Sequence, residues 1–113
     1  MTPRLQKVLD YVQEHQQEYI DMLLDLCRQP SLAGTGEGIP EMIALVQEKM
    51  RSVGIEPTLI PTDGNPVIYA EITGESSRTY GCYDHYDVQP VDPIELWDSD
   101  PFAAEIRDGV IYA

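Results

Sequence analysis

The residues best suited to chemistry in this sequence are His85 and Asp87, which lie two positions apart, after an apolar stretch and before several prolines. An imidazole is a good metal ligand, and a carboxylate that accepts the proton of its other ring nitrogen fixes its tautomer. In extended backbone, residues i and i+2 point to the same side, so these two side chains are expected to meet. Because a zinc site takes about four ligands, the pair would make only half of one.

The spacing of His85 and Asp87 also fits a polar strand end whose histidine bonds locally, and spacing alone leaves both interpretations open. Asp84 is the weaker partner for His85, because adjacent side chains of a strand point to opposite sides. Cys82 falls opposite His85 by the same alternation. No Gly-x-Ser-x-Gly sequence is present either, so neither a cysteine nor a serine nucleophile is favoured.

A long amphipathic helix is predicted ahead of this pair. Thr2 followed by Pro3 is typical of a helix start, and apolar residues at helical spacing continue to about Arg28. One helix is therefore expected over 3–28, ended by the proline that follows. His15 falls within it and is interpreted as an exposed helix residue.

A loop and a second helix follow. The segment 31–39 holds three glycines and is expected to be a loop. A phosphate-binding role for it is a weak alternative, because no strand precedes it, no lysine follows it and Glu37 would repel phosphate. The second helix is expected over 40–53, with Gly54 as its C-terminal cap.

The apolar period then changes to that of short strands. A strong turn signal at 62–66 and the dipeptide Asp108-Gly109 predict two hairpins. Helices followed by strands indicate an α/β domain, in which sites gather beyond the carboxyl ends of strands. The strand before His85 would place it at such an end. The expected strands are 58–60, 67–72, 79–83, 104–107 and 110–113.

Composition limits the partners and the compartment. The chain has 113 residues and a formal charge of −13, from 20 acidic and 7 basic residues, which argues against nucleic acid and anionic membranes. No segment reaches the ~18 to 20 apolar residues of a membrane span, and no apolar signal core is seen, so a cytoplasmic location is expected. Cys27 and Cys82 are expected to be reduced and buried.

Four segments together resemble a zinc metallopeptidase family. This family includes acetylornithine deacetylase, succinyl-diaminopimelate desuccinylase, aminoacylase, carboxypeptidase G and the carnosinase-like dipeptidases. The resemblance covers nearly the whole chain, is most specific over 83–113, and looks closest to the dipeptidase branch. The segments are Asp-Gly-Asn-Pro (63–66), His-Tyr-Asp-Val-Gln-Pro-Val-Asp-Pro (85–93), Leu-Trp-Asp-Ser-Asp-Pro-Phe (96–102) and Ile-Arg-Asp-Gly-Val-Ile-Tyr-Ala (106–113).

The resemblance implies the N-terminal part of an α/β/α sandwich catalytic domain that binds two zinc ions. It implies that His85 is a zinc ligand and that Asp87 serves catalysis by orienting His85. The remaining ligands, the general base, and a lid and dimerisation domain would lie beyond residue 113. Tyr80 and Gly81 depart from a more aliphatic strand, and Asp84 stands where a small or amide residue is common.

Two hypotheses of function follow. In the first, residues 1–113 are the N-terminal portion of a zinc-dependent dipeptidase or amidohydrolase acting on dipeptides or N-acyl amino acids, and are inactive alone. In the second, the chain is a non-catalytic module that associates with itself or with another protein. The second rests on the sheet, because a mostly parallel sheet needs both faces covered and two helices are expected to leave one face bare.

Overall fold

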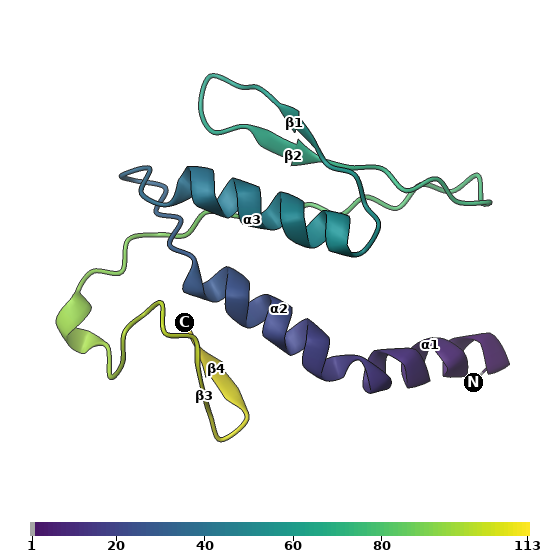
Figure 1. The fold of residues 1–113 in the computed structure, drawn as a ribbon, viewed down its shortest axis with the longest axis horizontal. Coiled ribbons are helices and arrows are strands. Elements are labelled where there is room, and N and C mark those ends of the chain that lie inside the picture. The colour runs from purple at the N-terminus through teal and green to yellow at the C-terminus, as the bar shows by residue number, and fades with distance from the viewer. Residues whose placement is uncertain (1) are drawn as a thin grey trace.

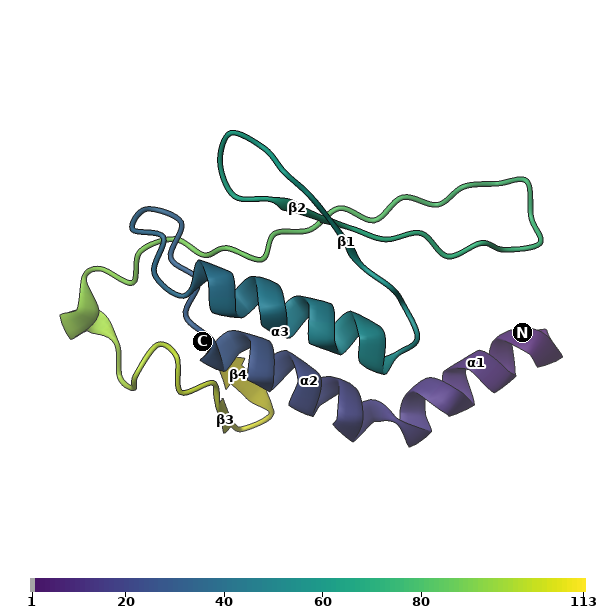
Figure 2. The same ribbon diagram turned by 45° about the horizontal axis from the view of Figure 1, so that its top comes forward.

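The structure is a computed structural model that describes residues 2–113. Helices come first, and two antiparallel hairpins follow them, β1 with β2 and β3 with β4. The β1–β2 hairpin, α3 and α2 lie in that order in both views (Figures 1 and 2). The elements are α1 (Pro3–Glu14), α2 (Gln16–Arg28), α3 (Ile39–Ser52), β1 (Thr58–Ile60), β2 (Val67–Tyr69), the 3-10 helix η1 (Ile94–Leu96), β3 (Glu105–Arg107) and β4 (Val110–Tyr112).

The prediction of one N-terminal helix is wrong, because the helix breaks at His15. The backbone of His15 has φ −103° and ψ 10°, outside the helical range. Its ring stacks on Tyr11 with centroids 3.9 Å apart, and its Nδ1 lies 2.9 Å from the Tyr11 carbonyl oxygen, which the His15 backbone N–H also contacts at 3.1 Å. The side chain thus competes for a helical acceptor, which gives a local cause for the bend between α1 and α2.

Both predicted helix caps are confirmed. The Thr2 side chain accepts a backbone N–H of the first turn at 3.3 Å. At the end of α3, Gly54 has φ +81° and donates to the Arg51 carbonyl at 3.0 Å, and Ile55 donates to the Met50 carbonyl at 2.9 Å. This pair of bonds is the Schellman arrangement, and it satisfies carbonyls that the helix leaves free.

The glycine-containing loop between α2 and α3 reverses the direction of the chain. Gly36 and Gly38 have φ of +75° and +72°, values that favour glycine. A Cβ on Gly38 would also lie 2.0 Å from the Pro30 carbonyl oxygen, whereas a Cβ on Gly36 would meet nothing within 4 Å. Gly38 therefore allows the start of α3 to approach the chain that leaves α2.

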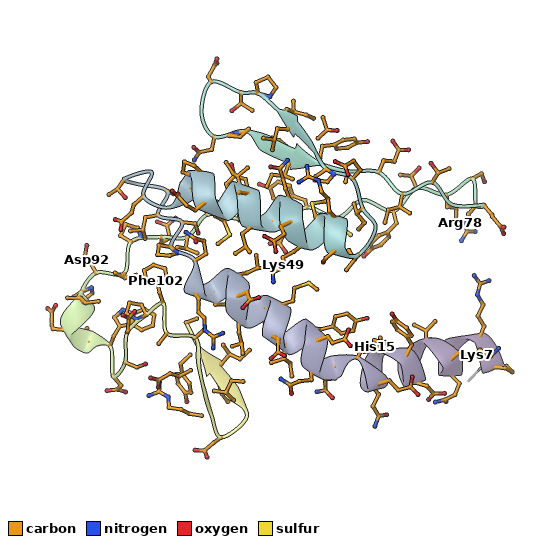
Figure 3. All side chains as sticks on the ribbon, viewed as in Figure 1. Lys7, His15, Lys49, Arg78, Asp92 and Phe102 are labelled. Carbon is orange, nitrogen blue, oxygen red and sulfur yellow. The ribbon has the colours of Figure 1, made fainter. Side chains whose placement is uncertain are left out.

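The small core lies where α2, α3 and the C-terminal segment meet. Its buried apolar side chains are Leu24, Ile39, Met42 and Ala104. Lys49 projects from α3 toward α2 (Figure 3) and donates to the carboxylate of Asp25. The hydrogen bond and the charge of Lys49 lower the pKa of Asp25, so the ion pair joins the two helices most strongly when that carboxylate is ionised.

Two strand predictions need correction. The segment 79–83 forms no strand, and the strand expected over 67–72 ends at Tyr69. Residues 70–83 instead form an extended arm that leaves the helices, with Arg78 near its tip (Figure 3). Tyr80 is 91% exposed on this arm. A strand forms only where a neighbour accepts its backbone hydrogen bonds, and within 2–113 the segment 79–83 pairs with no other strand.

The described chain exposes far more surface than a self-contained domain. Its accessible area is 9113 Å², against roughly 6200 Å² expected for a folded protein of this mass. Its radius of gyration is 17.0 Å, against roughly 13 Å for a compact chain of this length. No residue of α1 is buried, so its apolar stripe is uncovered. The fold is an open α/β arrangement with apolar faces available for contact.

The cysteine prediction is half right. Both cysteines are free thiols, as expected, and Cys27 is half-buried on α2. Cys82 is exposed, contrary to expectation, because the arm that carries it has no covering layer. Among the described residues, no helix is long and apolar enough to cross a membrane.

The close approach at Gly38 predicts a difference between two alanine variants. Gly36→Ala is expected to lower the free energy of unfolding by roughly 1–2 kcal/mol, the cost of a positive φ for a residue with a Cβ. Gly38→Ala adds the contact with Pro30 and is expected to cost about 2–4 kcal/mol. Urea denaturation followed by circular dichroism measures both. Equal losses would show that the chain relaxes around the added methyl group.

The ion pair between Asp25 and Lys49 predicts a pH dependence. The folded-state pKa of Asp25 lies below its unfolded value, so its stabilisation is full above about pH 3.9 and is lost as the pH falls through the folded pKa. The melting temperature of the wild type should therefore exceed that of Asp25→Asn at about pH 6, and the difference should shrink toward about pH 3. Asp10→Asn is the control, because Asp10 bonds within α1 to Gln6. If the difference in melting temperature between wild type and Asp25→Asn does not change with pH, the ion pair between Asp25 and Lys49 does not contribute this stability.

Candidate metal centre

His85 and Asp87 meet as the sequence predicts. The Nδ1 atom of His85 lies 2.9 Å from Oδ1 of Asp87. A carboxylate only accepts hydrogen bonds, so Nδ1 donates and the neutral ring keeps its lone pair on Nε2. The Asp87 side chain is 31% exposed and that of His85 is 67% exposed. The carboxylate thus fixes the tautomer from a partly buried position, while the ring faces outward.

The Nε2 atom of His85 has a partner that the sequence analysis missed. The Tyr83 hydroxyl lies 3.2 Å from it, and the two rings meet edge to face with centroids 5.5 Å apart. Tyr83 stands two residues before His85, so the alternation that predicted the Asp87 contact could also have revealed this one. Tyr83, His85 and Asp87 therefore form one hydrogen-bonded row along a single side of the chain.

Tyr86 anchors this row from the opposite side of the backbone. Its hydroxyl donates to the Pro66 carbonyl at 2.7 Å, which ties the row to the turn between β1 and β2. Burial raises the pKa of the Tyr86 phenol, and the neighbouring charge of Asp87 raises it further. The phenol therefore stays protonated and able to donate over the neutral pH range.

A second anchor follows the row directly. The Val88 backbone N–H donates to the Ser31 carbonyl at 2.9 Å, and the Ala33 N–H donates to the Val88 carbonyl at 3.1 Å. These bonds make an isolated parallel bridge between Leu32 and Val88. Ser31 is fully buried there. The loop after α2 thereby fixes the chain one residue beyond Asp87.

Neither the carboxylate of Asp84 nor the thiol of Cys82 completes a metal site with His85 and Asp87. Oδ1 of Asp84 accepts the backbone N–H of His85 at 2.9 Å, so this carboxylate caps the backbone. No group of three or more His, Cys, Asp or Glu side chains suited to a metal ion occurs in the part of the chain that the structure describes. His15 lies at the junction of α1 and α2 (Figure 3). The described residues thus offer at most half a metal site, with one candidate nitrogen ligand, His85, and a carboxylate hydrogen-bonded to its ring.

A large open groove borders this half-site. It has a volume of about 1240 Å³ and lies between α2, α3, β2 and the segment 82–91. Most of its lining surface is apolar, and His85 and Asp87 are among the residues that line it. Its lining side chains include Leu23, Leu26, Met42, Val46, Met50, Tyr69, His85, Asp87 and Ala113.

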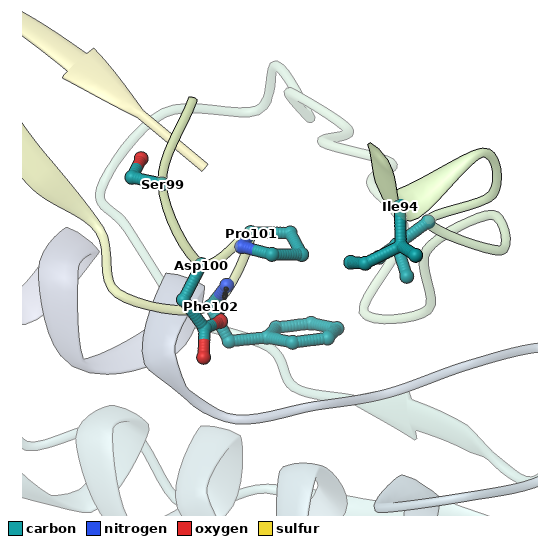
Figure 4. A pocket seen from close by; sticks show the side chains of 6 residues that line it. Ile94, Ser99, Asp100, Pro101 and Phe102 are labelled. Atoms are coloured by element: carbon teal, nitrogen blue, oxygen red, sulfur yellow. Dashed lines mark hydrogen bonds between the residues drawn. The ribbon is translucent and has the colours of Figure 1, made fainter. Parts of the chain in front are cut away.

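A smaller hollow lies near η1. It has a volume of about 430 Å³, and Figure 4 shows Ile94 and the rings of Pro101 and Phe102 around it. Its carboxylate, on Asp100, accepts the Phe102 backbone N–H at 2.8 Å. That bond uses the carboxylate to hold the turn, so this hollow offers packing surface and no evident chemistry.

Comparisons with known proteins identify the family. No protein-family model matches the chain. It is 34% identical to succinyl-diaminopimelate desuccinylase 2 of Ruegeria sp. (strain TM1040) over 88% of its length, and 28% identical to the desuccinylase of Hahella chejuensis (strain KCTC 2396) over 82%. It also matches the M20 family metallo-carboxypeptidase Sso-CP2 of Sulfolobus solfataricus, with a TM-score of 0.77 and 43% identity over 80% of the chain.

These matches place the chain in the M20 family of metallopeptidases and related hydrolases. Its helices and hairpins fit the N-terminal part of an M20 peptidase domain, as the resemblance implies. The chain spans 25% and 23% of the two desuccinylases and 21% of the carboxypeptidase. The placement nearest the dipeptidases stays a prediction, because these relatives are desuccinylases and a carboxypeptidase.

Proposed function

We propose that this chain is the N-terminal part of a zinc-dependent hydrolase of peptide or N-acyl amide bonds, in which His85 is a metal ligand. The observation that carries the proposal is the hydrogen bond from His85 Nδ1 to Asp87, which leaves Nε2 as the basic nitrogen. This is the arrangement in which a carboxylate orients a metal-binding imidazole. The M20 relatives supply the reaction class.

Each residue has a separate task in this proposal. A bound zinc ion supplies Lewis acidity and lowers the pKa of its water toward about 7. His85 presents the Nε2 lone pair, and Asp87 holds the ring in the required tautomer and raises its basicity. The anchors at Tyr86 and Val88 fix the backbone on both sides of Asp87. The chain therefore supplies a positioned ligand.

The remaining parts of the site are proposed to come from further sequence in the complete enzyme. A zinc site takes about four ligands, and the described residues supply a pair. We place the other ligands, the general base, and a lid and dimerisation domain outside residues 1–113, so this chain alone should not hydrolyse amides. Dipeptides or N-acyl amino acids are the proposed substrates. The strong negative charge argues against nucleic-acid and anionic-membrane partners, and we propose a cytoplasmic location.

The role of Asp87 predicts a selective effect on zinc binding. Titration of the chain with zinc, followed by NMR of the His85 ring in a His15→Gln background, should show His85 binding zinc weakly. Asp87→Asn is expected to weaken that binding by about 10- to 100-fold, the usual effect of removing such a partner. Asp84→Asn is the matched control, because it removes the same charge from a carboxylate that bonds the backbone.

The outcomes of this titration separate orientation from simple charge. Equal weakening by the two variants would indicate that charge alone attracts zinc. A His85 ring that does not respond to zinc would refute its role as a ligand. Amide hydrolysis by the purified 113-residue chain would refute the proposal that the site needs further sequence.

Self-association is a second candidate function, favoured by the exposed surface. The accessible area of 9113 Å² exceeds that of a self-contained chain by roughly 2900 Å². A stable protein interface buries about 1200–2000 Å² in total, so enough surface is available for a second copy. The apolar groove beside α2 and α3 is the proposed contact face.

This second function predicts an apparent mass that rises with concentration in sedimentation experiments. Leu23 lines the groove and is 47% exposed, so Leu23→Ser should weaken the association. Leu96→Ser is the control, because Leu96 is a more exposed leucine on η1, outside the groove. A monomer at all concentrations with a cooperative melt would contradict self-association. Equal effects of both variants would show that the contact between copies lies outside the groove.

A further inference from the structure

We propose that the Tyr83 hydroxyl acts as a placeholder on the metal-binding nitrogen of His85, so that a metal ion must displace it to bind. This inference rests on the proposed function, because it takes His85 as a ligand. It gives a role to Tyr83, which neither the metal chemistry nor the sequence pattern singles out. The observation that carries it is the 3.2 Å contact between the Tyr83 hydroxyl and His85 Nε2.

The direction of this hydrogen bond follows from the bond on the other side of the ring. Asp87 accepts from Nδ1, so the neutral imidazole has an unprotonated Nε2 that can only accept. The Tyr83 hydroxyl therefore donates its proton to that lone pair. A metal ion needs the same lone pair, and two groups cannot use it at once. Tyr83 and the metal compete for one atom.

The position of Tyr83 allows the displacement. Tyr83 is 87% exposed and belongs to the uncovered arm of residues 70–83. The Tyr83 side chain is held by the hydrogen bond and the edge-to-face packing with His85. A rotation of this side chain would break those contacts without opening the core. The Asp87 bond would remain, so His85 would keep its orientation while its other nitrogen becomes free.

The placeholder also accounts for a feature of the half-site. Without the Tyr83 hydroxyl, the exposed His85 Nε2 would accept a hydrogen bond from water, and a metal ion would displace that water instead of a side chain. The Tyr83 hydroxyl donates one exposed hydrogen bond to the Nε2 lone pair. Breaking that bond is a weak barrier to metal binding. A site with its full set of ligands would overcome such a barrier, whereas His85 alone would bind metal less readily.

The test compares Tyr83→Phe with Tyr80→Phe in the His15→Gln chain at neutral pH. Tyr80 is 91% exposed on the same arm, and it controls for the loss of any exposed hydroxyl. Long-range ¹⁵N NMR of His85 should show the Nε2 resonance of metal-free Tyr83→Phe moving toward that of an unbonded imidazole nitrogen. Titration with zinc alone should give a Kd about two- to tenfold lower in Tyr83→Phe, the range expected for one exposed hydrogen bond.

The outcomes distinguish the placeholder from the ligand. A lower Kd and a shifted Nε2 resonance in Tyr83→Phe alone would support the proposal. Unchanged values in Tyr83→Phe, with zinc still binding at His85, would overturn the placeholder and leave the proposed function intact. A weaker affinity in Tyr83→Phe would overturn it by showing that the hydroxyl assists binding. No response of His85 to zinc in any variant would overturn both proposals.

Discussion

The position of the candidate site depends on the hydrogen bonds that join Val88 to the loop after α2. Val88 donates to Ser31 and accepts from Ala33, and it follows Asp87 directly. The tether from Tyr86 to Pro66 holds the row of Tyr83, His85 and Asp87 to the turn between β1 and β2, and the two Val88 bonds hold the chain beyond Asp87 to the loop after α2. These bonds fix the end of the row beside the helices. One isolated bridge thus joins the segment that carries His85 and Asp87 to the loop between α2 and α3.

The local features of this fold could be predicted from the sequence because their causes are local. Thr2 and Gly54 cap helices through bonds to neighbouring residues. The dipeptide Asp108-Gly109 has φ of +50° and +79° at the tip of the β3–β4 hairpin, as its turn chemistry requires. The contact of His85 with Asp87 follows from the alternation of side chains along extended backbone, and it survives even though no strand is present.

The remaining features could not be predicted because they depend on distant or absent neighbours. The helix break is the exception, because it lies at His15, whose ring stacks on Tyr11 four residues away, and apolar periodicity does not encode that stacking. The tether from Tyr86 to the Pro66 carbonyl spans 20 residues of sequence. The segment 79–83 has strand-like composition, but a strand also needs a hydrogen-bonding neighbour. The residue types and their spacing therefore predicted the contact between His85 and Asp87, whereas the anchoring of this pair required the folded chain.

The tether and the bridge also bear on the order in which the chain folds. The turn through Gly38 joins two adjacent helices and closes a short loop, which costs little conformational entropy. The bridge from Leu32 to Val88 closes a loop that contains α3 and the whole β1–β2 hairpin. Contacts of such long sequence separation form after local ones, because their entropy is lost before their bonds are gained. This difference in loop length predicts that the helices assemble first and that the candidate half-site takes its final shape late in folding.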